Sequence, residues 1–416
     1  MSAKLLLPGW RRVRLGDVLR QVDRFEAVDP NREYRLLGVR WYANGCHLHS
    51  SVRGRELKTP QLATARVGDV TYNKMWTSKG AFGVIQAEQD GFAATSEYPL
   101  FVPRNGDVDP QFLACVFSRP RFWQRARALC KGTTQRARLN PADFLRIDVD
   151  LPAPDYQRRA VAAVQAVDHA ISANEELVLR MAALKTALTD ELLSKGLPSR
   201  RSALKPSELG EVPADWEVHA LKELAAVQTG LAKNKAEAAK GAIEVPYLRV
   251  ANVQDGFVSC DDLKRIRVKE EDIERYGLQR GDVLMTEGGD NDKLGRGCVW
   301  EGVVEPCIHQ NHVFAVRCGP RINPEFLALF SASSRGRRYF KGASKQTTNL
   351  ASINSTQLKQ LPVPVPPPAE QSQIGSIVAE MRRAAAQGKA LVEHLACVRS
   401  QLIESFVRKE SHGHDR

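Results

Sequence analysis

Few residue patterns in this chain of 416 residues could carry out catalysis. Glu56 and Lys58 have the ExK spacing of metal-dependent nucleases, in which a carboxylate holds Mg²⁺ and a lysine stabilises charge. His309 and His312 could suggest a pair of metal ligands, but the sequence supplies no further ligand for them. We therefore interpret the first pair as an exposed surface pair and the histidines as part of a polar turn. We predict no catalytic and no metal-binding residue.

Sequence motifs for nucleotide binding, hydrolysis and methyl transfer are also absent. The chain has no P-loop, no dinucleotide-binding GxGxxG, no HExxH and no GxSxG. The glycine-rich stretch 288–297 has the wrong spacing for a phosphate loop, and we interpret it as a turn-rich loop. The Asp/Asn-Pro-Pro-Tyr/Phe motif of DNA methyltransferases is missing as well. We expect no enzymatic activity from this chain alone.

Two basic segments are candidates for nucleic-acid binding. They lie within 121–138 and 335–345, contain no acidic residue, and each joins a predicted helix to a Thr-Thr loop. Lys and Arg neutralise phosphates, while Thr and Gln can hydrogen-bond phosphates or base edges. The alternative is a solvated helix face, which we weigh below DNA docking because the charge recurs in both places. The DNA contacts predicted here are Arg127, Lys131, Thr133, Thr134, Gln135, Arg136, Arg338, Lys341, Lys345, Gln346, Thr347 and Thr348.

A second candidate patch is the loop 73–80, with its counterpart at 290–297. Both loops follow a Gly-Asp-Val sequence, yet their own sequences differ completely. A shared framework with divergent polar loops is what two domains that read different DNA sequences would show. Trp76 could equally be a core aromatic residue. The DNA contacts predicted here are Lys74, Trp76, Thr77, Lys79, Asn291, Lys293 and Arg296.

An internal repeat must position these segments. Gly68-Asp69-Val70 recurs as Gly281-Asp282-Val283, and Pro110-Gln111-Phe112-Leu113 as Pro324-Glu325-Phe326-Leu327, at offsets that remain between 206 and 214 across the chain. Each copy begins with about 150 residues of short β-rich runs broken by Gly, Asn and Asp turns, which predicts a mixed α/β domain. A long helix-like stretch without internal proline follows each copy.

Apolar residues in the long stretches recur every three or four positions, which places them on one helical face. A helix of about 36 residues would be about 54 Å long, too long to hide in either domain, so we expect the two helices to cover each other as a coiled coil. The alternative is that each helix packs on its own domain. The stripe in the first stretch consists of Val161, Val164, Val167, Ile171, Val178, Met181, Leu184, Leu188 and Leu192.

The predicted fold class is α+β, with two repeated mixed α/β domains and two long helices. The boundaries follow from the proline clusters and the polar segment between the copies. We place the first domain at 1–153, the first helix at 154–195, a linker at 196–215, the second domain at 216–366 and the second helix at 367–410.

Charge points to a polyanionic partner. The net charge is +12 and the pI about 9.4, which favours nucleic acid over an acidic membrane surface or acidic protein. The surplus is uneven, because residues 1–206 carry 32 basic and 21 acidic side chains and residues 207–416 carry 28 and 27. The cysteines have no zinc-site spacing, and no stretch resembles a signal peptide or membrane span. We expect a cytoplasmic protein.

Several short motifs carry a resemblance to a known family. They are 207–216 (SELGEVPADW), 280–284 (RGDVL), Gln310-Asn311, Thr347-Thr348-Asn349 and 361–364 (LPVP) followed by Glu370-Gln371. In order and duplication, this pattern resembles the specificity (S) subunit of type I restriction-modification systems. The resemblance implies two target recognition domains separated by an antiparallel coiled coil. Each domain would read one half of a bipartite, asymmetric DNA sequence, and the helices would set the spacer.

The resemblance also implies partners. The chain would recruit two methyltransferase (M) subunits that use S-adenosylmethionine, and ATP- and Mg²⁺-dependent restriction (R) subunits, with no cofactor of its own. The first copy departs from the pattern, with Asp155-Tyr156-Gln157 where the second has Ala369-Glu370-Gln371. We therefore predict a DNA sequence-specificity subunit. The alternatives are a coiled-coil protein adaptor without sequence-specific DNA binding, and a nuclease acting through Glu56 and Lys58.

Overall fold

The chain folds into two compact units, each mixing short sheets and helices. The computed structural model describes residues 9–132, 137–200, 202–232, 243–289, 294–295, 297–346 and 351–407. Unit 1 comprises Met1–Asn174 with Leu391–Arg416, and unit 2 comprises Glu175–Ala390. The predicted α+β class with two repeated domains and two long helices is confirmed. Each long helix contributes one part to each unit.

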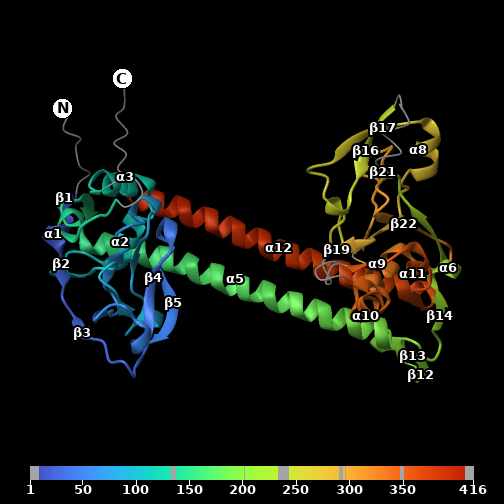
Figure 1. Cartoon of the computed structure of the whole chain (residues 1–416), viewed down its shortest axis with the longest axis horizontal. Helices are drawn as coiled ribbons and strands as arrows, with labels where there is room; N and C mark the ends of the chain where they lie inside the picture. Colours follow the sequence, from blue (N-terminus) through green and yellow to red (C-terminus); the bar gives the residue numbers. More distant parts are fainter. Residues whose placement is uncertain are drawn as a thin grey trace. The chain divides into compact units, whose positions relative to one another are not determined.

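Unit 1 is built mainly from short strands (Figure 1). The strands are β1 (Trp10–Arg14), β2 (Leu19–Val22), β3 (Phe25–Ala27), β4 (Glu33–Val39), β5 (Cys46–Arg53), β6 (Gln61–Thr64), β7 (Val70–Tyr72), β8 (Phe82–Val84), β9 (Ala93–Ala94), β10 (Leu100–Pro103) and β11 (Asp148–Pro152). The helices before the first long helix are α1 (Leu15–Val18), η1 (Trp41–Ala43), η2 (Gly54–Glu56), η3 (Thr77–Lys79), η4 (Ala87–Gln89), α2 (Pro110–Phe117), α3 (Pro120–Ala128) and α4 (Pro141–Phe144).

Unit 2 repeats many of these elements. Its strands are β12 (Leu204–Ser207), β13 (Gly210–Pro213), β14 (Glu217–Ala220), β15 (Ala225–Thr229), β16 (Ile243–Leu248), β17 (Lys264–Val268), β18 (Val283–Thr286), β19 (Gly288–Gly289), β20 (Gly297–Val299), β21 (Ile308–His309), β22 (Val313–Cys318), β23 (Lys345–Gln346), β24 (Ala351–Ser352) and β25 (Pro362–Val365). Its shorter helices are η5 (Pro198–Arg200), α6 (Leu221–Leu224), η6 (Val250–Asn252), α8 (Glu270–Tyr276), α9 (Pro324–Ala332), α10 (Ser334–Ala343) and α11 (Ser355–Lys359).

The sequence repeat corresponds to a repeated sheet topology. Unit 1 has a four-stranded sheet in the order β2-β10-β7-β8, and unit 2 has one in the order β15-β22-β18-β20. The strands occupy equivalent places along the two copies, and all the pairings in both sheets are antiparallel. A two-stranded sheet joins the ends of each copy, β1 with β11 and β14 with β25. Each copy therefore closes on itself before its long helix begins.

The repeated Gly-Asp-Val sequence forms the same turn in both units. Gly68 and Gly281 have φ values of +83° and +92°, a left-handed conformation that glycine adopts without steric cost. Each following aspartate is buried and accepts the N–H three residues before it: Asp69 from Arg66 at 2.9 Å and Asp282 from Gln279 at 2.8 Å. This turn sets the start of β7 and β18, the strands that lead into the predicted recognition loops.

A buried glutamine near the start of each long helix ties it to its own domain. Gln157 accepts the N–H of Asp109 at 2.8 Å and donates to two carbonyls, and Gln371 accepts the N–H of Asn323 at 2.7 Å and also donates to two carbonyls. Asp109 and Asn323 are themselves the N-cap residues of α2 and α9. The same three-way connection thus occurs in both copies.

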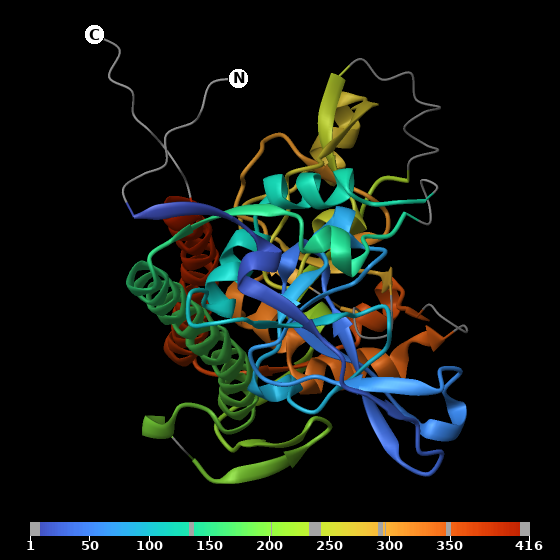
Figure 2. The same cartoon turned by 90° about the vertical axis from the view of Figure 1, so that its left-hand side faces the viewer.

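The two long helices are α5 (Pro154–Lys195) and α12 (Pro368–Val407), and they run antiparallel within each unit (Figures 1 and 2). In unit 1, the N-terminal part of α5 contacts the C-terminal part of α12. In unit 2, the C-terminal part of α5 contacts the N-terminal part of α12. The contacts are Tyr156 with Phe406, Asp168 with Arg399, and Val178 with Gly388. The helix ends also enter the domain cores, Val161 and Ile403 in unit 1 and Leu192 and Ile374 in unit 2. Both packing modes weighed from the sequence are therefore present.

Two details differ from the sequence-based expectations. Leu184, assigned to the buried stripe of α5, is exposed. The segment 196–215, expected to be an irregular linker, contains η5 and the β12–β13 hairpin, and it buries Leu197 and Val212. Its polar, proline-rich composition hides these two apolar contacts. Among the described residues, no helix is both long and apolar enough to cross a membrane.

Candidate nucleic-acid interface

In each unit, one backbone hydrogen bond joins a residue that follows the basic segment to a residue at or shortly before the second predicted patch. In unit 1, the N–H of Leu139, just past the basic segment, donates to the carbonyl of Lys74 at the start of the loop 73–80 (3.1 Å). In unit 2, the N–H of Ile353 donates to the carbonyl of Glu287 at 2.8 Å, at equivalent positions. The bonded residues are 65 positions apart in unit 1 and 66 positions apart in unit 2. The fold therefore brings described residues that flank or begin the two patches together in both copies.

Backbone hydrogen bonds fix the ends of the loops near these residues, and we call each such set of bonds a frame. In unit 1, Lys131 and Arg138 form an antiparallel bridge with both backbone hydrogen bonds, at 3.0 and 2.9 Å, and so close the loop between them. In unit 2, β24 pairs with both β19 and β23, which brings the ends of two loops to one small sheet. Both frames are independent of side-chain type, so loop sequences can diverge upon them.

Side chains at the base of the loop 73–80 fix its shape. Asn73 is buried, and its Oδ1 accepts the N–H groups of Met75 and Trp76 at 3.0 and 3.3 Å. Thr77 is only 1% exposed, and its hydroxyl lies 3.3 Å from the Sγ of Cys130. Thr77 therefore has no surface with which to reach DNA, and we withdraw it from the predicted contacts. Its role is to hold the loop against α3.

Trp76 lies on the surface, so the interpretation of a core aromatic residue is wrong. Its side chain is 42% exposed and contacts Trp41, which is 44% exposed, with ring centroids 5.3 Å apart. Lys79 is exposed, and its ammonium lies 6.0 Å from the centroid of Trp41. Lys74 is partly exposed. Trp41 was missed by the sequence analysis, although an aromatic pair in a turn with Asn44 and Gly45 is an available signal.

The basic side chains of α3 and its C-terminal turn differ in their availability. Arg127 is exposed on α3. Lys131 is also exposed, but its ammonium lies 3.0 Å from the Oδ2 of Asp143, and the hydrogen bond from Lys131 lowers the pKa of that carboxyl group. Arg125 donates to the carbonyl of Asp148 at 3.0 Å. Arg127 is therefore the better placed of the two predicted contacts to meet a phosphate.

In unit 2, the equivalent basic residues lie on α10. Arg338 and Lys341 are exposed, as a phosphate contact requires. Arg335 is half-buried and donates to the carbonyl of Glu211 at 2.7 Å, and burial lowers the pKa of its guanidinium group. Arg337 lies 3.4 Å from Asp255. The charged groups of α10 are thus divided between internal contacts and the surface.

Most of the other predicted contacts cannot be placed. Thr133, Thr134, Gln135, Arg136, Asn291, Lys293, Arg296, Thr347 and Thr348 lie outside the described residues, as do the side chains of Lys345 and Gln346. The described residues that flank them are those joined by the two frames given above. The candidate interface is therefore defined by Lys74, Trp76, Lys79, Arg127 and Lys131 in unit 1 and by Arg338 and Lys341 in unit 2.

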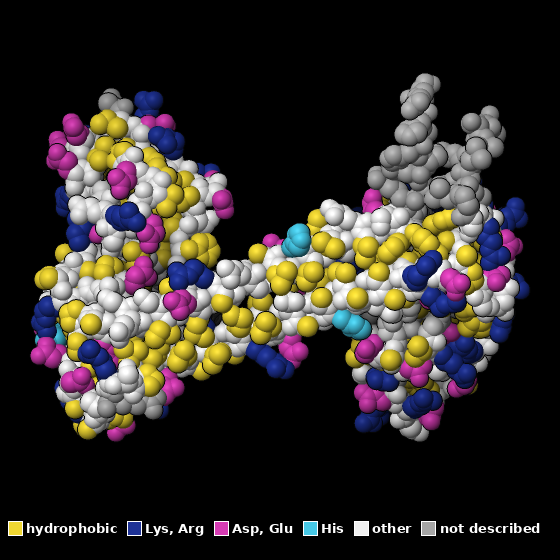
Figure 3. Space-filling view, turned by 180° about the vertical axis from the view of Figure 1, so that it is seen from behind, with side chains coloured by type: hydrophobic (Ala, Val, Ile, Leu, Met, Phe, Trp, Pro, Cys, Tyr) yellow, Lys and Arg dark blue, Asp and Glu magenta, His cyan; other side chains and the backbone are white. Residues whose placement is uncertain are grey.

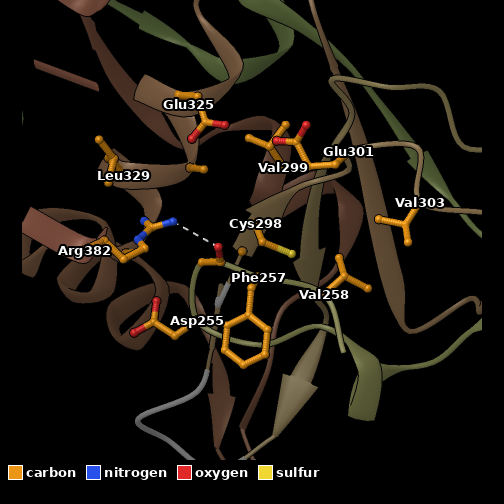
Figure 4. Close-up of a pocket in the computed structure, with 14 residues that line it drawn as sticks. Asp255, Phe257, Val258, Cys298, Val299, Glu301, Val303, Glu325, Leu329 and Arg382 are labelled. Atoms are coloured by element: carbon orange, nitrogen blue, oxygen red, sulfur yellow. Dashed lines mark hydrogen bonds between the residues drawn. The ribbon is translucent and has the colours of Figure 1, made fainter. Parts of the chain in front are cut away.

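A pocket of about 250 Å³ in unit 2 does not fit a phosphate. Figure 4 shows Glu301 and Glu325 beside it, with Arg382 of α12 donating to the carbonyl of Gly256 at 3.0 Å. Burial raises the pKa of Glu325, and the charge of Glu301 raises it further against the effect of Arg382. Asp255 adds a third carboxyl group to the lining. These acidic groups would repel a phosphodiester, so we leave this pocket out of the interface.

The buried cysteines and His309 lie in structural surroundings rather than in a reactive site. Burial raises the pKa of the Cys46, Cys298, Cys307 and Cys318 thiols to about 12, which keeps them protonated at neutral pH. His309 is buried, and its Nδ1 lies 2.7 Å from the carbonyl oxygen of Val313 as a donor. Glu56 and Lys58 are exposed. Among the described residues, no group of three or more His, Cys, Asp or Glu side chains could hold a metal ion.

Comparison with known proteins places this chain beside DNA specificity proteins. Residues 213–389 match the family model described as type I restriction modification DNA specificity domain. The putative type I restriction enzyme MjaX specificity subunit of Methanocaldococcus jannaschii is 33% identical over 179 residues, 42% of this chain and 41% of that protein. The MjaVIII specificity subunit of the same organism is 25% identical over 376 residues, 87% and 83% of the two chains.

The fold also has a solved relative. A chain from a structure of the complex assembly and conformational transition of the type I R-M system has a TM-score of 0.61 and 18% sequence identity. The alignment covers 97% of this chain and 99% of that one. At this identity the likeness shows the fold alone. Residues 1–212 lie outside the matched family model. The four-stranded sheet of unit 1 nevertheless has the same topology as the four-stranded sheet of unit 2.

Proposed function

We propose that the chain is a type I restriction-modification specificity subunit and binds double-stranded DNA at a bipartite, asymmetric sequence. The proposal is supported by the match of residues 213–389 to the DNA specificity domain and by the similarity to two specificity subunits. Unit 1 and unit 2 each contact one half of the sequence. The chain brings methyltransferase subunits, and restriction subunits where the host has them, to that site. The alignment to the MjaX relative spans two fifths of its length, so DNA and partner subunits are proposals for this chain.

The observation that carries the proposal is the pair of equivalent hydrogen bonds, Leu139 to Lys74 and Ile353 to Glu287. Each bond connects the chain that follows a basic segment to the chain at or just before a sequence-divergent loop. Cations that neutralise phosphates and polar loops that reach base edges are the two parts that specific DNA recognition needs. Two such assemblies in one chain match a target with two different halves. A solvated helix face would not require the same loop partner in both copies.

Partner docking is supported by the long helices. Figure 3 shows hydrophobic side chains exposed along them. Leu177, Leu179 and Leu184 of α5 are all more than half exposed, and Leu391 of α12 is 44% exposed. Leu177 and Leu184 are seven positions apart, which places them on one face of α5, and exposed apolar side chains on one face mark an interaction site more often than isolated ones do. We assign this surface to a methyltransferase subunit, since DNA would meet charged side chains instead.

Catalysis in this proposal belongs to the partner subunits. S-adenosylmethionine, ATP and Mg²⁺ bind to them and not to this chain, and the complex acts on chromosomal DNA in the cytoplasm. The buried, protonated thiols and the structural contacts of His309 support this division. The chain then contributes sequence choice alone.

The experiment is to express the chain with its methyltransferase and to map methylated positions in the host DNA. The expected result is one bipartite motif with a fixed spacer, and specific binding of a duplex with that motif in moderate salt. A matched variant combines Arg127→Glu with Arg338→Glu, which reverses one exposed cation in each unit. The control Arg158→Glu reverses an exposed cation near the start of α5. Equal binding of all duplexes by the wild-type complex would refute the proposal.

If the complex formed but bound no duplex in any condition, the chain would be a protein adaptor. In that case the variants with reversed charges would keep the same partners and the same activity as the wild type.

A further inference from the structure

An exposed aromatic surface on unit 1 is unexplained by phosphate binding. Trp41 and Trp76 come from loops 35 residues apart, yet their rings lie 5.3 Å apart and tilted by 45°. Tyr42, 54% exposed, and Met75, 37% exposed, adjoin them in sequence. We call Trp41 and Trp76 the indole pair. Soluble proteins seldom gather large apolar side chains on a surface unless the surface binds something.

The backbone that presents the indole pair is held in an uncommon conformation. Tyr42 has φ 60° and ψ 31°, and Ala43 has φ 53°, so two consecutive non-glycine residues are left-handed. Such residues cost free energy and persist only where surrounding contacts impose them, most often at functional sites. The imposing contact here is the hydrogen bond from the N–H of Ala43 to the carbonyl of Gly80, at 2.7 Å. It locks one loop of the indole pair to the other.

The backbone at Gly80, which accepts this hydrogen bond, is tightly packed. Gly80 has φ +70°, and a Cβ there would lie 2.3 Å from the ring of Trp123 on α3. Tyr42 also contacts the Trp123 ring, with centroids 5.8 Å apart. The Nε1 of Trp123 donates to the carbonyl of Phe117, which fixes that ring. The indole pair is therefore a preformed surface on a rigid base.

Charge around the indole pair favours a polyanion. The two loops, 40–44 and 73–80, contain Arg40, Lys74 and Lys79 and no acidic residue. The adjoining segment 119–132 adds five more cations, again without an acid. Lys79 lies within cation–π range of Trp41. An exposed aromatic pair with a cation beside it matches nucleic acid, in which base faces lie between phosphates. A protein partner would need an acidic surface with an apolar centre.

Unit 2 has no equivalent of the indole pair. η6 follows β16 as η1 follows β4, but Val250 follows Arg249 in unit 2 where Trp41 follows Arg40 in unit 1. The loop 290–297 contains no aromatic residue in place of Trp76. The indole pair therefore supports a contact that unit 1 makes with its half of the target and that unit 2 does not make with the other half.

We propose that the indole pair stacks against bases at one unstacked step of the half-site that unit 1 contacts. This inference rests on the proposed function and specifies how unit 1 reads DNA. Side chains that enter a base step kink the duplex, and the cost depends on the step, least for pyrimidine–purine steps. Unit 1 therefore selects its half-site partly by the ease with which one step opens. Unit 2 reads an unopened duplex.

The test uses the complex with its methyltransferase subunit and a duplex bearing its mapped motif. 2-Aminopurine replaces one base at a time across both half-sites, because its fluorescence rises when it loses its stacking neighbour. The expected result is a rise at one step of the unit 1 half-site upon binding. The double variant Trp41→Ala/Trp76→Ala should abolish the rise and weaken specific binding about 10- to 100-fold, with non-specific binding changed less than about 2-fold.

Trp76→Phe keeps a stacking face and should retain most of the signal. Phe257→Ala removes an exposed aromatic residue of unit 2 and is the matched control. The wild-type measurement needs no variant, so a variant that fails to fold does not block the test. The absence of any fluorescence rise in the unit 1 half-site would overturn the inference. A double variant that binds the motif and unstacks its bases as the wild type does would overturn it as well. Loss of the methyltransferase subunit from the double variant, with DNA unstacking unchanged, would overturn it by assigning the indole pair to a protein.

The two proposals fail separately. A wild-type complex that binds its motif without unstacking it leaves the specificity function in place and removes only the role of the indole pair. A wild-type complex without any sequence preference removes the specificity function itself.

Discussion

The indole Nε1 of Trp216 donates a hydrogen bond to Oε2 of Glu370 at 3.2 Å, and both side chains are buried. The other oxygen, Oε1, accepts the N–H of Leu197 at 2.9 Å. One carboxylate thus connects the end of α5, the entry to the second copy and the start of α12. In unit 1 the equivalent tryptophan, Trp10, instead meets Tyr156 edge-on at 5.7 Å. The departure of the first copy from the Glu-Gln pattern is therefore a change from a hydrogen bond to an aromatic contact.

Glu370→Ala should destabilise the chain by about 2 to 5 kcal/mol, because it leaves two buried donors unpaired. Urea unfolding followed by circular dichroism measures the change. Glu370→Gln keeps one acceptor and should cost less. Glu380→Ala, at an exposed position of the same helix, is the control and should change stability by less than about 0.5 kcal/mol. Equal effects of Glu370→Ala and Glu380→Ala would contradict the role of this carboxylate.

Gly388 of α12 lies directly against Val178 of α5. A Cβ at this position would lie 2.8 Å from the Cγ2 of Val178, a distance that real Cβ atoms do not adopt. Gly388→Leu should therefore push the helices apart and destabilise the chain by about 1 to 3 kcal/mol, although leucine favours helix more than glycine does. Gly375→Ala, where the nearest atom would be 3.7 Å away, is the control and should be neutral or stabilising. The thermal midpoint of each variant checks the order, and a rise for Gly388→Leu would contradict it.

His309 should make stability depend on pH. Burial lowers its pKa to about 4, against smaller opposing effects of its bond to Val313 and the charge of Asp282. Charge on Arg317 lowers it slightly further. An unfolded histidine titrates near pH 6.5, so between about pH 6.5 and 4 the unfolded chain binds a proton that the folded chain does not. The contribution of neutral His309 is complete above about pH 6.5 and is lost as the pH falls towards 4.

At pH 5 this loss should approach about 2 kcal/mol. The measurement is urea unfolding at pH 7 and pH 5 for wild type and His309→Gln, which does not titrate. The variant should be less stable at pH 7 but should lose less stability between the two pH values. His312→Gln changes a half-exposed neighbour and should keep the wild-type difference. A wild-type pH dependence in His309→Gln would show that other groups cause it.

Salt dependence should separate Arg127 from Lys131. Each phosphate contact contributes about −0.9 to the slope of log K against log salt concentration. Arg127→Ala should flatten the slope by about that amount. Lys131→Ala should flatten it less, because Lys131 already pairs with Asp143 at 3.0 Å. Target-duplex binding by the methyltransferase complex between about 50 and 200 mM salt gives the slopes, and an unchanged slope for Arg127→Ala would remove it from the interface.

Residues 1–206 carry most of the surplus positive charge, so the salt dependence of binding can also be compared between the two units. Neutralising one exposed cation in each unit, Lys79 and Lys341, compares them directly. A larger change for Lys79→Ala would show that the basic total of the first half sets the strength of binding. Equal changes would show that local placement on α10 outweighs the total.

The repeat and the long helices could be predicted because their signals are local or periodic. Apolar residues every third or fourth position define a helix face, and duplicated turns such as Gly68-Asp69 and Gly281-Asp282 need no partner to be recognised. The same argument failed for Leu184, because the periodic stripe does not say where along its length a partner helix stops covering it.

The candidate interface was only half predictable. Polar type and loop position selected Thr77, yet a contact with Cys130, 53 residues away, buries it. Trp41 was missed because its partner Trp76 is 35 residues away in the chain, and their loops meet through tertiary contacts such as the bond between Ala43 and Gly80. Loop shape depends on such distant contacts, whereas helix shape depends on neighbours.

The bonds from Leu139 to Lys74 and from Ile353 to Glu287 use main-chain atoms at both ends. Any non-proline residue supplies the same donor, and every residue supplies the same acceptor. Substitutions within the loops can therefore accumulate without loosening the framework that holds them. New sequence preferences can arise in one copy by point mutation while the other copy keeps its own, and a protein of this design can change its target one half at a time.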